Sequence, residues 1–280
     1  MSFALPPEGH ETRFVSAAWC QQLPMFRFDT SLTADGRQIA EQETRPFLEA
    51  IWRLVPWRWI NAPNAVRRGS NKMLQLRVAS ACGFPIPPTY VGNDPVLIRQ
   101  FHERFDHDVI IKDLDLPVLE LADGPYYSFT TRLATQALEQ LDGLRFAPVC
   151  LQQHVKKRYE LRVTVVGNRV FAARIDSQAS SETAMDYRRG ELWSKPERYA
   201  ATAIPDAVAA RCRSVVHALD LDYGAVDLIV DPDDRYVFLE VNSTGAWIWI
   251  QGLTGLHITE AIADLLIAQA DGHYARVGAT

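Results

Sequence analysis

The sequence has little cysteine and no closely spaced pair of cysteines. The four cysteines stand at positions 20, 82, 150 and 212 and form no CxxC pair, so neither a zinc site nor a disulfide framework is expected. No basic N-terminal region precedes an apolar run, and no apolar run reaches the roughly 18 residues of a membrane span. These absences predict a cytoplasmic protein with reduced thiols, no secretion signal and no membrane segment.

An excess of basic charge is also missing. The formal net charge is −5 and the sequence pI is about 5.8, so a general nucleic-acid binder is not expected. The chain has 280 residues, of which 48% are apolar. That length and apolar content provide the core of one large domain or two small ones.

The hydrophobic pattern changes along the chain. Apolar residues recur at helical spacing over 38–54, although Pro46 predicts a break there, and a second helix is predicted over 70–82. From about residue 96, strand patterns alternate with helical ones. We therefore divide the chain into a small N-terminal region, residues 1–92, and a larger α+β body, residues 93–280.

The hairpin AVDLIVDPDDRYVFLEVN concentrates oxygen-bearing side chains on one face. A four-residue loop pairs Asp231 with Tyr236, which places Asp227 opposite Glu240 and on the same face as Asn242. Carboxylates so close repel each other unless a cation or a proton lies between them. Magnesium suits such hard oxygen ligands. The hairpin therefore predicts a magnesium site.

In this register, Leu239 and Val241 point to the other face, into a core. The alternative interpretation is a hairpin whose polar face simply meets water. The turn at residues 243–245, Ser-Thr-Gly, favours the metal site because it would bring backbone amides near bound phosphates.

The hairpin ELRVTVVGNRVFAARID carries two arginines. Arg162 and Arg174 share a face only if the loop between the strands has an odd number of residues, which predicts a three-residue loop over 167–169. A two-residue turn would place them on opposite faces unless a bulge intervenes. Two adjacent guanidinium groups need an anion, such as a transferring phosphoryl group. The alternative is a solvated pair neutralised by Glu160 and Asp176.

Two lysines are weak signals when taken alone. Lys112 ends the β-branched strand VIIK, and Lys72 lies near a helix N-terminus. For Lys112 alone, a surface lysine with a buried stem is the favoured interpretation, and Lys72 is an equally weak signal.

Taken in order, these residues resemble the signature of the ATP-grasp superfamily. The elements in order are Lys72, Lys112, the strand QQHV ending at Val155, the run Glu160-Leu-Arg162, Arg174, Asp227 and the run Glu240-Val-Asn242. Within the superfamily, the chain resembles the ribosomal-peptide ligases that build microviridins and related graspetides. That narrower likeness rests on WRWINAPNAVRRGSNKMLQLRVASACGFPIPPTYVGNDP, KKRYELRVTVVGNRVFAARIDSQ, DYRRG and FLEVNSTGAWIWI.

The resemblance implies an α+β ATP-grasp fold, in which two lobes sandwich ATP, here with a shortened N-terminal pre-grasp region. That shortening puts leader-peptide recognition, or the substrate itself, in question. The implied nucleotide contacts are Lys72 and Lys112 at the phosphates, the hinge residues Gln153, His154 and Val155 around adenine, and Glu160 at the ribose. Implied for the metal, as two magnesium ions, are Asp227, Glu240 and Asn242. Arg162 and Arg174 are the implied catalytic residues, and Arg188 of DYRRG would also meet the phosphate or acyl phosphate.

The resemblance implies that a precursor peptide is the substrate. Its side-chain carboxylate would be activated as an acyl phosphate, with release of ADP, and then joined to a Ser/Thr hydroxyl or a Lys amine. The segment 177–204, which includes Trp193, is either the region that contacts the peptide or an ordinary surface loop. Trp247 and Trp249 either line the substrate pocket or belong to a core or interface. Family likeness also allows a homodimer, which no residue pattern here supports.

Two alternative functions share much of this signature. One is a ligase of free amino acids or small molecules, or one that adds an amino acid to a protein C-terminus; it would use the same ATP and metal residues. The other is a non-catalytic nucleotide-binding or partner-binding module. The presence of both lysines and all three metal-type residues speaks against it.

Overall fold

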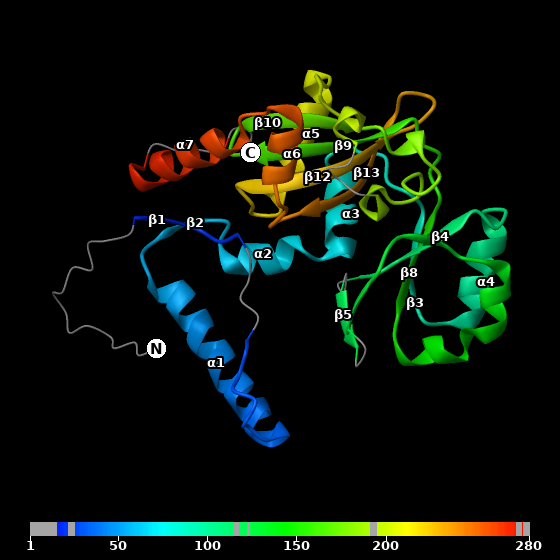
Figure 1. The fold of residues 1–280 in the computed structure, drawn as a ribbon, viewed down its shortest axis with the longest axis horizontal. Helices are drawn as coiled ribbons and strands as arrows, with labels where there is room; N and C mark the ends of the chain where they lie inside the picture. Colours follow the sequence, from blue (N-terminus) through cyan, green and yellow to red (C-terminus); the bar gives the residue numbers. More distant parts are fainter. Residues whose placement is uncertain are drawn as a thin grey trace.

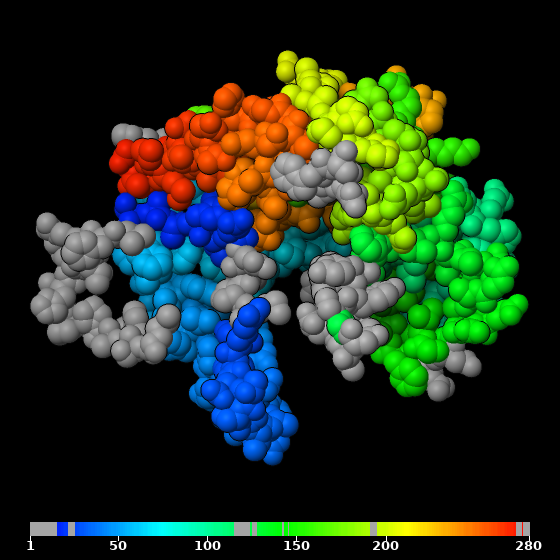
Figure 2. Space-filling view, viewed as in Figure 1, coloured from blue at the N-terminus to red at the C-terminus, as the bar shows by residue number. Residues whose placement is uncertain are grey.

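The computed structural model describes residues 16–21, 26–114, 118–121, 124–190, 195–272 and 276. These residues form two α+β lobes side by side, with a long N-terminal helix projecting from the body (Figures 1 and 2). Within the described part of the chain, no helix is long and apolar enough to cross a membrane.

The smaller lobe is built on a four-stranded antiparallel sheet in the order β3-β8-β4-β7. Its strands are β3 (Thr89–Gly92), β4 (Val109–Lys112), β7 (Thr131–Arg132) and β8 (Val149–Gln153). Helix α4 (Pro95–Arg104) and the 3₁₀ segment η1 (Thr135–Phe146) pack on it through a core of Ile98, Val109, Leu141 and Leu151. A two-stranded hairpin, β5 (Val118–Leu121) and β6 (Gly124–Tyr127), lies between β4 and β7 in sequence.

The larger lobe is built on a five-stranded antiparallel sheet in the order β11-β10-β9-β12-β13. Its strands are β9 (Tyr159–Val166), β10 (Arg169–Ile175), β11 (Tyr199–Ala201), β12 (Tyr223–Val230) and β13 (Tyr236–Asn242). The described residues between β10 and β11 include the short 3₁₀ segments η2 (Ser177–Ala179), η3 (Tyr187–Arg189) and η4 (Pro196–Arg198).

Helices cover both faces of the larger sheet. Helices α3 (Lys72–Ala81) and α5 (Asp206–Ala218) bury one face, in a core that includes Leu76, Cys212 and Phe238. Helices α6 (Ile248–Thr254) and α7 (Ile258–Ala270) cover one end of the other face. The remaining part of that face lines the cavity described below.

The N-terminal region contributes to the larger lobe. Strand β1 (Ala17–Trp19) pairs in parallel with β2 (Arg58–Ile60), and helix α2 (Pro63–Gly69) leads into α3. Because β3 pairs with β8, the predicted boundary after residue 92 falls at the end of a strand of the smaller lobe. The division into residues 1–92 and 93–280 itself stays a prediction.

The projecting helix corrects one expectation. Helix α1 (Ala34–Leu54) runs through Pro46 without a break and has no buried residue. A proline removes only one main-chain hydrogen bond, and here the turns on both sides continue the helix. The predicted break at Pro46 is therefore wrong.

A buried asparagine ties the N-terminal region to the larger sheet. Asn61 accepts hydrogen bonds from the backbone amides of Asp222 and Tyr223, and donates to the carbonyls of Tyr223 and Ser243. Its side chain has only 1% exposure. Four main-chain groups therefore depend on one side-chain amide.

We expect Asn61→Ala to lower the free energy of unfolding by about 3 kcal/mol, because it leaves buried main-chain groups without partners. Urea unfolding measures the change. Asn64→Ala is the matched control, since Asn64 is exposed on the neighbouring helix. A loss no larger for Asn61 than for Asn64 would contradict this account.

Candidate functional site

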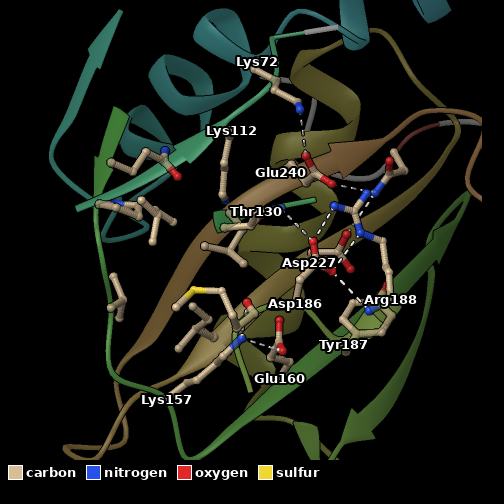
Figure 3. Close-up of a pocket in the computed structure, with 18 of the residues that line it drawn as sticks. Lys72, Lys112, Thr130, Lys157, Glu160, Asp186, Tyr187, Arg188, Asp227 and Glu240 are labelled. Carbon is tan, nitrogen blue, oxygen red and sulfur yellow. Dashed lines mark hydrogen bonds and ion pairs between the residues drawn. The ribbon is translucent and has the colours of Figure 1, made fainter. Parts of the chain in front are cut away.

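A cavity of about 380 Å³ lies between the two lobes. Most of the predicted site residues line it: Lys72, Lys112, Gln153, His154, Val155, Glu160, Arg162, Arg188, Asp227, Glu240 and Asn242. Figure 3 shows the Lys72 ammonium group directed toward Glu240, with Lys112 and Asp227 in the same part of the cavity and with Lys157 and Glu160 at the other end. Residues far apart in sequence thus converge on one space.

The three metal-type residues lie together, as predicted. Asp227 on β12 pairs directly with Glu240 on β13. The Asn242 amide nitrogen lies 2.9 Å from Asp227 Oδ2 and 3.4 Å from Glu240 Oε1. The predicted convergence of three oxygen-bearing side chains is therefore present in the structure.

The register that produces this convergence differs from the predicted one. Tyr236 pairs with Val230 rather than with Asp231. A β-bulge between the pairs of Leu228 and Asp227 then shifts the register by one residue, so that Asp227 still lies opposite Glu240. Because the bulge shifts the face of one residue, Leu239 lines the cavity and Phe238 enters the core. The expectation that Leu239 points into the core is wrong.

Asp227 is a buried carboxylate held by an arginine. Burial raises the pKa of Asp227 to about 6, and the nearby negative charge of Glu240 acts in the same direction against the opposing effect of Arg162. Arg162 Nη1 donates to both oxygens of Asp227, at 2.8 and 3.1 Å. A second cation near this carboxylate pair would offset the repulsion between them.

The pKa of Glu240 is shifted in the opposite direction to that of Asp227. Burial opposes its ionisation, but the positive charges of Lys72, Lys112 and Arg188 outweigh burial and lower its pKa. Lys72 Nζ lies 3.7 Å from Glu240 Oε2 and donates to the carbonyl of Asp113 at 2.7 Å. Burial also lowers the pKa of Lys112. Both lysines bring positive charge to the carboxylate end of the cavity.

The two hairpin arginines do not share a face. The turn holds two residues, Gly167 and Asn168, so Arg162 pairs with Ala173 and Arg174 pairs with Leu161. Arg174 is exposed and lies over the ring of Tyr159, at 4.3 Å from its centroid. The predicted three-residue loop is therefore wrong, and Arg174 faces away from the cavity, because strand parity turns it to the other side.

The predicted hinge residues belong to the cavity lining. Gln153, His154 and Val155 line the cavity just after β8. His154 Nδ1 lies 3.2 Å from Asp108 Oδ1, which fixes the ring, while burial lowers the pKa of His154. The segment thus places a half-buried imidazole ring at the cavity wall.

Lys157 is a cavity residue that sequence reasoning missed. Its ammonium group donates to Glu160 Oε1 at 2.8 Å and to the Met185 carbonyl at 3.1 Å, and its side chain is 5% exposed. The available signal was the run KKRYE, which places Lys157 three residues before Glu160. The pair holds Glu160 in position.

Asp186 is a second missed residue. It accepts from Arg188 Nε at 2.9 Å and from Arg188 Nη2 at 2.6 Å, and also from the Thr130 backbone amide. The motif DYRRG contained this two-residue spacing, but the contact with Thr130 could not be read from it. Asp186 therefore orients Arg188 and joins the two lobes at the cavity edge.

The aromatic run after β13 divides between the core and the cavity. Trp247 is buried, and its indole nitrogen donates to Thr259 Oγ1 at 2.9 Å. Trp249 lines the cavity and stacks on Tyr187, with ring centroids 6.1 Å apart. Trp193, predicted to contact a peptide, lies outside the described residues.

Gly245 brings the backbone close to the buried arginine. A Cβ atom added there would lie 2.5 Å from Arg162 Nη2, 2.9 Å from Ala225 Cβ and 3.0 Å from Asn242 Cβ. Any side chain at this position must displace Arg162 or Asn242. Glycine is therefore needed for the close packing of this end of the cavity.

We expect Gly245→Ala to lower the ATP turnover that the resemblance implies about tenfold or more, because it moves groups that hold Asp227. Steady-state ADP release measures the effect. Gly143→Ala is the control, since a Cβ atom there meets nothing within 4 Å. Equal rates for the two variants would contradict the role of close packing at Gly245.

The donor set fits a hard divalent cation. Two carboxylates and one amide oxygen on adjacent strands are ligands that Mg²⁺ accepts, with phosphate oxygens and water completing its shell. Among the described residues, no cluster of three or more His, Cys, Asp or Glu side chains is suited to a metal. Two carboxylates and one amide leave positions in the shell of such a cation open to water or to oxygens of a ligand.

Comparison with known proteins agrees with this geometry. A family model described as the RimK-like ATP-grasp domain matches residues 69–266. The chain is similar to a RiPP-associated ATP-grasp ligase of Chryseobacterium gregarium in complex with ADP and a leader and core peptide. The identity is 32% and the TM-score 0.79, over 88% of this chain and 74% of that chain. No curated protein matches the chain.

Two further solved structures are similar. The macrocyclase MdnC of Microcystis aeruginosa MRC, bound with precursor peptide MdnA, shares 27% identity, with a TM-score of 0.78 over 90% of this chain and 78% of that chain. The ATP-grasp ligase PsnB, complexed with a phosphomimetic variant of a minimal precursor, Mg and ADP, shares 26% identity. Its TM-score is 0.66, over 83% of this chain and 69% of that chain.

Proposed function

The chain belongs to the RimK-like ATP-grasp family, and from this premise we propose that it is an ADP-forming ligase that closes rings in a peptide. It would join a side-chain carboxylate to a hydroxyl or amine of the same peptide. The convergence of two lysines, two carboxylates and two arginines on one cavity between the lobes carries the proposal. The similar ligases crystallised with leader, core or precursor peptides support the substrate class.

The cavity residues divide into three proposed roles. Gln153, His154 and Val155 would hold adenine, and Glu160, fixed by Lys157, would hold the ribose. Lys72 and Lys112 would neutralise the phosphates. Arg188, oriented by Asp186, would stabilise negative charge on the transferred phosphoryl group and the acyl phosphate.

Asp227, Glu240 and Asn242 would hold Mg²⁺, as two ions in the fullest arrangement. Bound there, the cation would supply charge neutralisation at the β- and γ-phosphates. Arg162 donates to both oxygens of Asp227 and so opposes the protonation of this carboxylate and holds it in place. We therefore assign Arg162 a positioning role, and we assign no role in the reaction to Arg174.

The proposed reaction needs no covalent enzyme residue. A carboxylate oxygen of the peptide attacks the γ-phosphorus of ATP, the bond to ADP breaks, and an acyl phosphate forms. A hydroxyl or amine of the peptide then attacks the acyl carbon, loses its proton, and displaces inorganic phosphate. Each bond removes one water from the peptide, and catalysis consists of positioning and charge stabilisation.

Mass spectrometry of a candidate acidic precursor peptide, incubated with the protein, ATP and Mg²⁺, tests the proposal. We expect the loss of one water per bond, with one ADP formed for each. Intact peptide together with intact ATP would overturn the proposal.

The same incubation separates the alternatives. A ligase of free amino acids, or one that extends a protein C-terminus, would increase the mass of its acceptor rather than reduce it. A non-catalytic module would bind ADP without consuming ATP. The peptide substrate is preferred because the similar ligases bind peptides and because Trp249 and Tyr187 add a stacked aromatic pair to the cavity lining.

A further inference from the structure

Gln75 is a buried side chain whose bonds the proposed reaction does not use. It lies on α3, one turn after Lys72, and is 2% exposed. Its Nε2 donates to the Val241 carbonyl at 2.8 Å and to the Gly69 carbonyl at 2.5 Å, while its Oε1 accepts from the Val241 amide at 3.0 Å. One side chain thus pairs with both main-chain groups of Val241.

Val241 belongs to an edge strand, β13, and its main-chain amide and carbonyl both point outward from the sheet, toward Gln75. Strand β13 is last in the order of its sheet, so among the strands that the structure describes none pairs with its outward main-chain groups. The amide of Phe238 donates outward to the Pro85 carbonyl at 2.9 Å, and the amide of Val241 donates outward to Gln75. The side-chain amide of Gln75 therefore takes the place of a strand.

The spacing of these outward bonds shows where the bulge is held. In a regular antiparallel strand, amides that face one edge recur every second residue. Phe238 and Val241 are three residues apart, so the extra residue of the bulge lies between them. Pro85 fixes the strand before the bulge, and Gln75 fixes it after the bulge.

The direction of two cavity side chains depends on this register. Glu240 and Asn242 flank Val241, and both line the cavity. A shift of one residue would turn both side chains to the opposite face. A bulge disrupts the ladder of main-chain hydrogen bonds locally. Pairing with β12 therefore fixes the register of β13 less firmly near the bulge than elsewhere along the strand.

We propose that Gln75 is a positioning residue that fixes β13 beyond the bulge and thereby holds Glu240 and Asn242 toward Asp227. Gln75 also joins helix α3, which begins at Lys72, to strand β13, which carries Glu240. The charged groups of Lys72 and Glu240 lie 3.7 Å apart. The inference rests on the proposed function only for the identity of the ligand that these groups bind.

Gln75→Met tests the inference, because methionine has a similar length and no amide. The Mg²⁺ concentration that half-saturates ADP binding, measured by calorimetry at a series of Mg²⁺ concentrations, is expected to rise about tenfold or more. Hydrogen exchange of residues 236–242, followed by mass spectrometry, is expected to accelerate. If Gln75→Met gives no folded protein, Gln75→Asn replaces it, since its amide is one methylene too short to reach Val241.

His217→Leu is the matched control. His217 is buried on α5 of the same lobe, its Nε2 lies 3.1 Å from the Gly167 carbonyl, and it does not line the cavity. This variant also loses a buried hydrogen bond to the main chain. We expect it to lower the thermal midpoint while leaving the Mg²⁺ dependence within twofold of the wild type.

The outcomes separate the two proposals. If Gln75→Met and His217→Leu lose similar stability and neither changes the Mg²⁺ dependence or the exchange of β13, Gln75 is merely structural and the inference is wrong. If wild-type protein binds ADP without any Mg²⁺ dependence, the proposed function fails instead. In that case hydrogen exchange of β13 alone decides the role of Gln75.

Discussion

Asp227→Asn is expected to reduce ATP-dependent turnover by about a thousandfold or more, equivalent to about 4 kcal/mol of transition-state stabilisation. The substitution keeps the shape of the side chain but removes one of the two carboxylates that face each other across β12 and β13. It also removes the charge that Arg162 contacts through two hydrogen bonds. ADP release at saturating ATP and Mg²⁺ measures the effect.

A surface aspartate provides the control for this substitution. Asp264 forms an exposed ion pair with Arg169, and exposed pairs contribute little to stability or function. Asp264→Asn should therefore retain turnover within about twofold. Unchanged turnover in Asp227→Asn would remove the metal-binding interpretation, provided that thermal unfolding shows both variants to be folded.

Arg188→Gln is expected to lower kcat by about a hundredfold while ADP affinity changes by less than about threefold. The reason is that Asp186 fixes the Arg188 guanidinium, whose charge acts on Glu240. A loss restricted to kcat corresponds to an interaction made mainly in the transition state. Steady-state kinetics and calorimetry with ADP separate the two quantities.

The neighbouring arginine provides an internal comparison. Arg189 is exposed, donates to Thr131 Oγ1 and lies over Phe129, and it does not line the cavity. Arg189→Gln should change kcat by less than about threefold. If the two variants behave alike, Arg188 has no specific role in the chemistry.

The sequence was most informative where two signals agreed: the alternation of side chains along a strand and the order of the family residues along the chain. The predicted α+β ATP-grasp fold and the resemblance to the graspetide ligases are confirmed by the family match and the similar solved structures. The opposition of Asp227 and Glu240 is also present, although two features of the predicted hairpin differ. The loop is one residue longer than predicted, and the bulge compensates for it.

Arg174 shows the limit of reasoning from parity alone. The turn after β9 could hold two or three residues, and that single difference decides which face of the sheet Arg174 occupies. Only the anion expected at the site favoured the longer loop. The local sequence Gly-Asn, which suits a two-residue turn, determined the outcome.

Lys157, Asp186 and Gln75 could not be assigned for a different reason. Their partners include Met185, Thr130 and Val241, and the last two contacts join residues 56 and 166 positions apart. Such contacts depend on how the lobes and helices pack, which periodicity does not determine. The proposed ligand roles of the cavity residues stay predictions until variants are measured.

The covering of β13 has a consequence for solubility. An edge strand with free outward amides can recruit the same strand of another molecule and start edge-to-edge aggregation. Pro85 and Gln75 occupy two of those amides on β13. Loss of the Gln75 contact would therefore open a site for intermolecular strand pairing, and concentrated Gln75→Met protein should form β-rich aggregates sooner than His217→Leu protein.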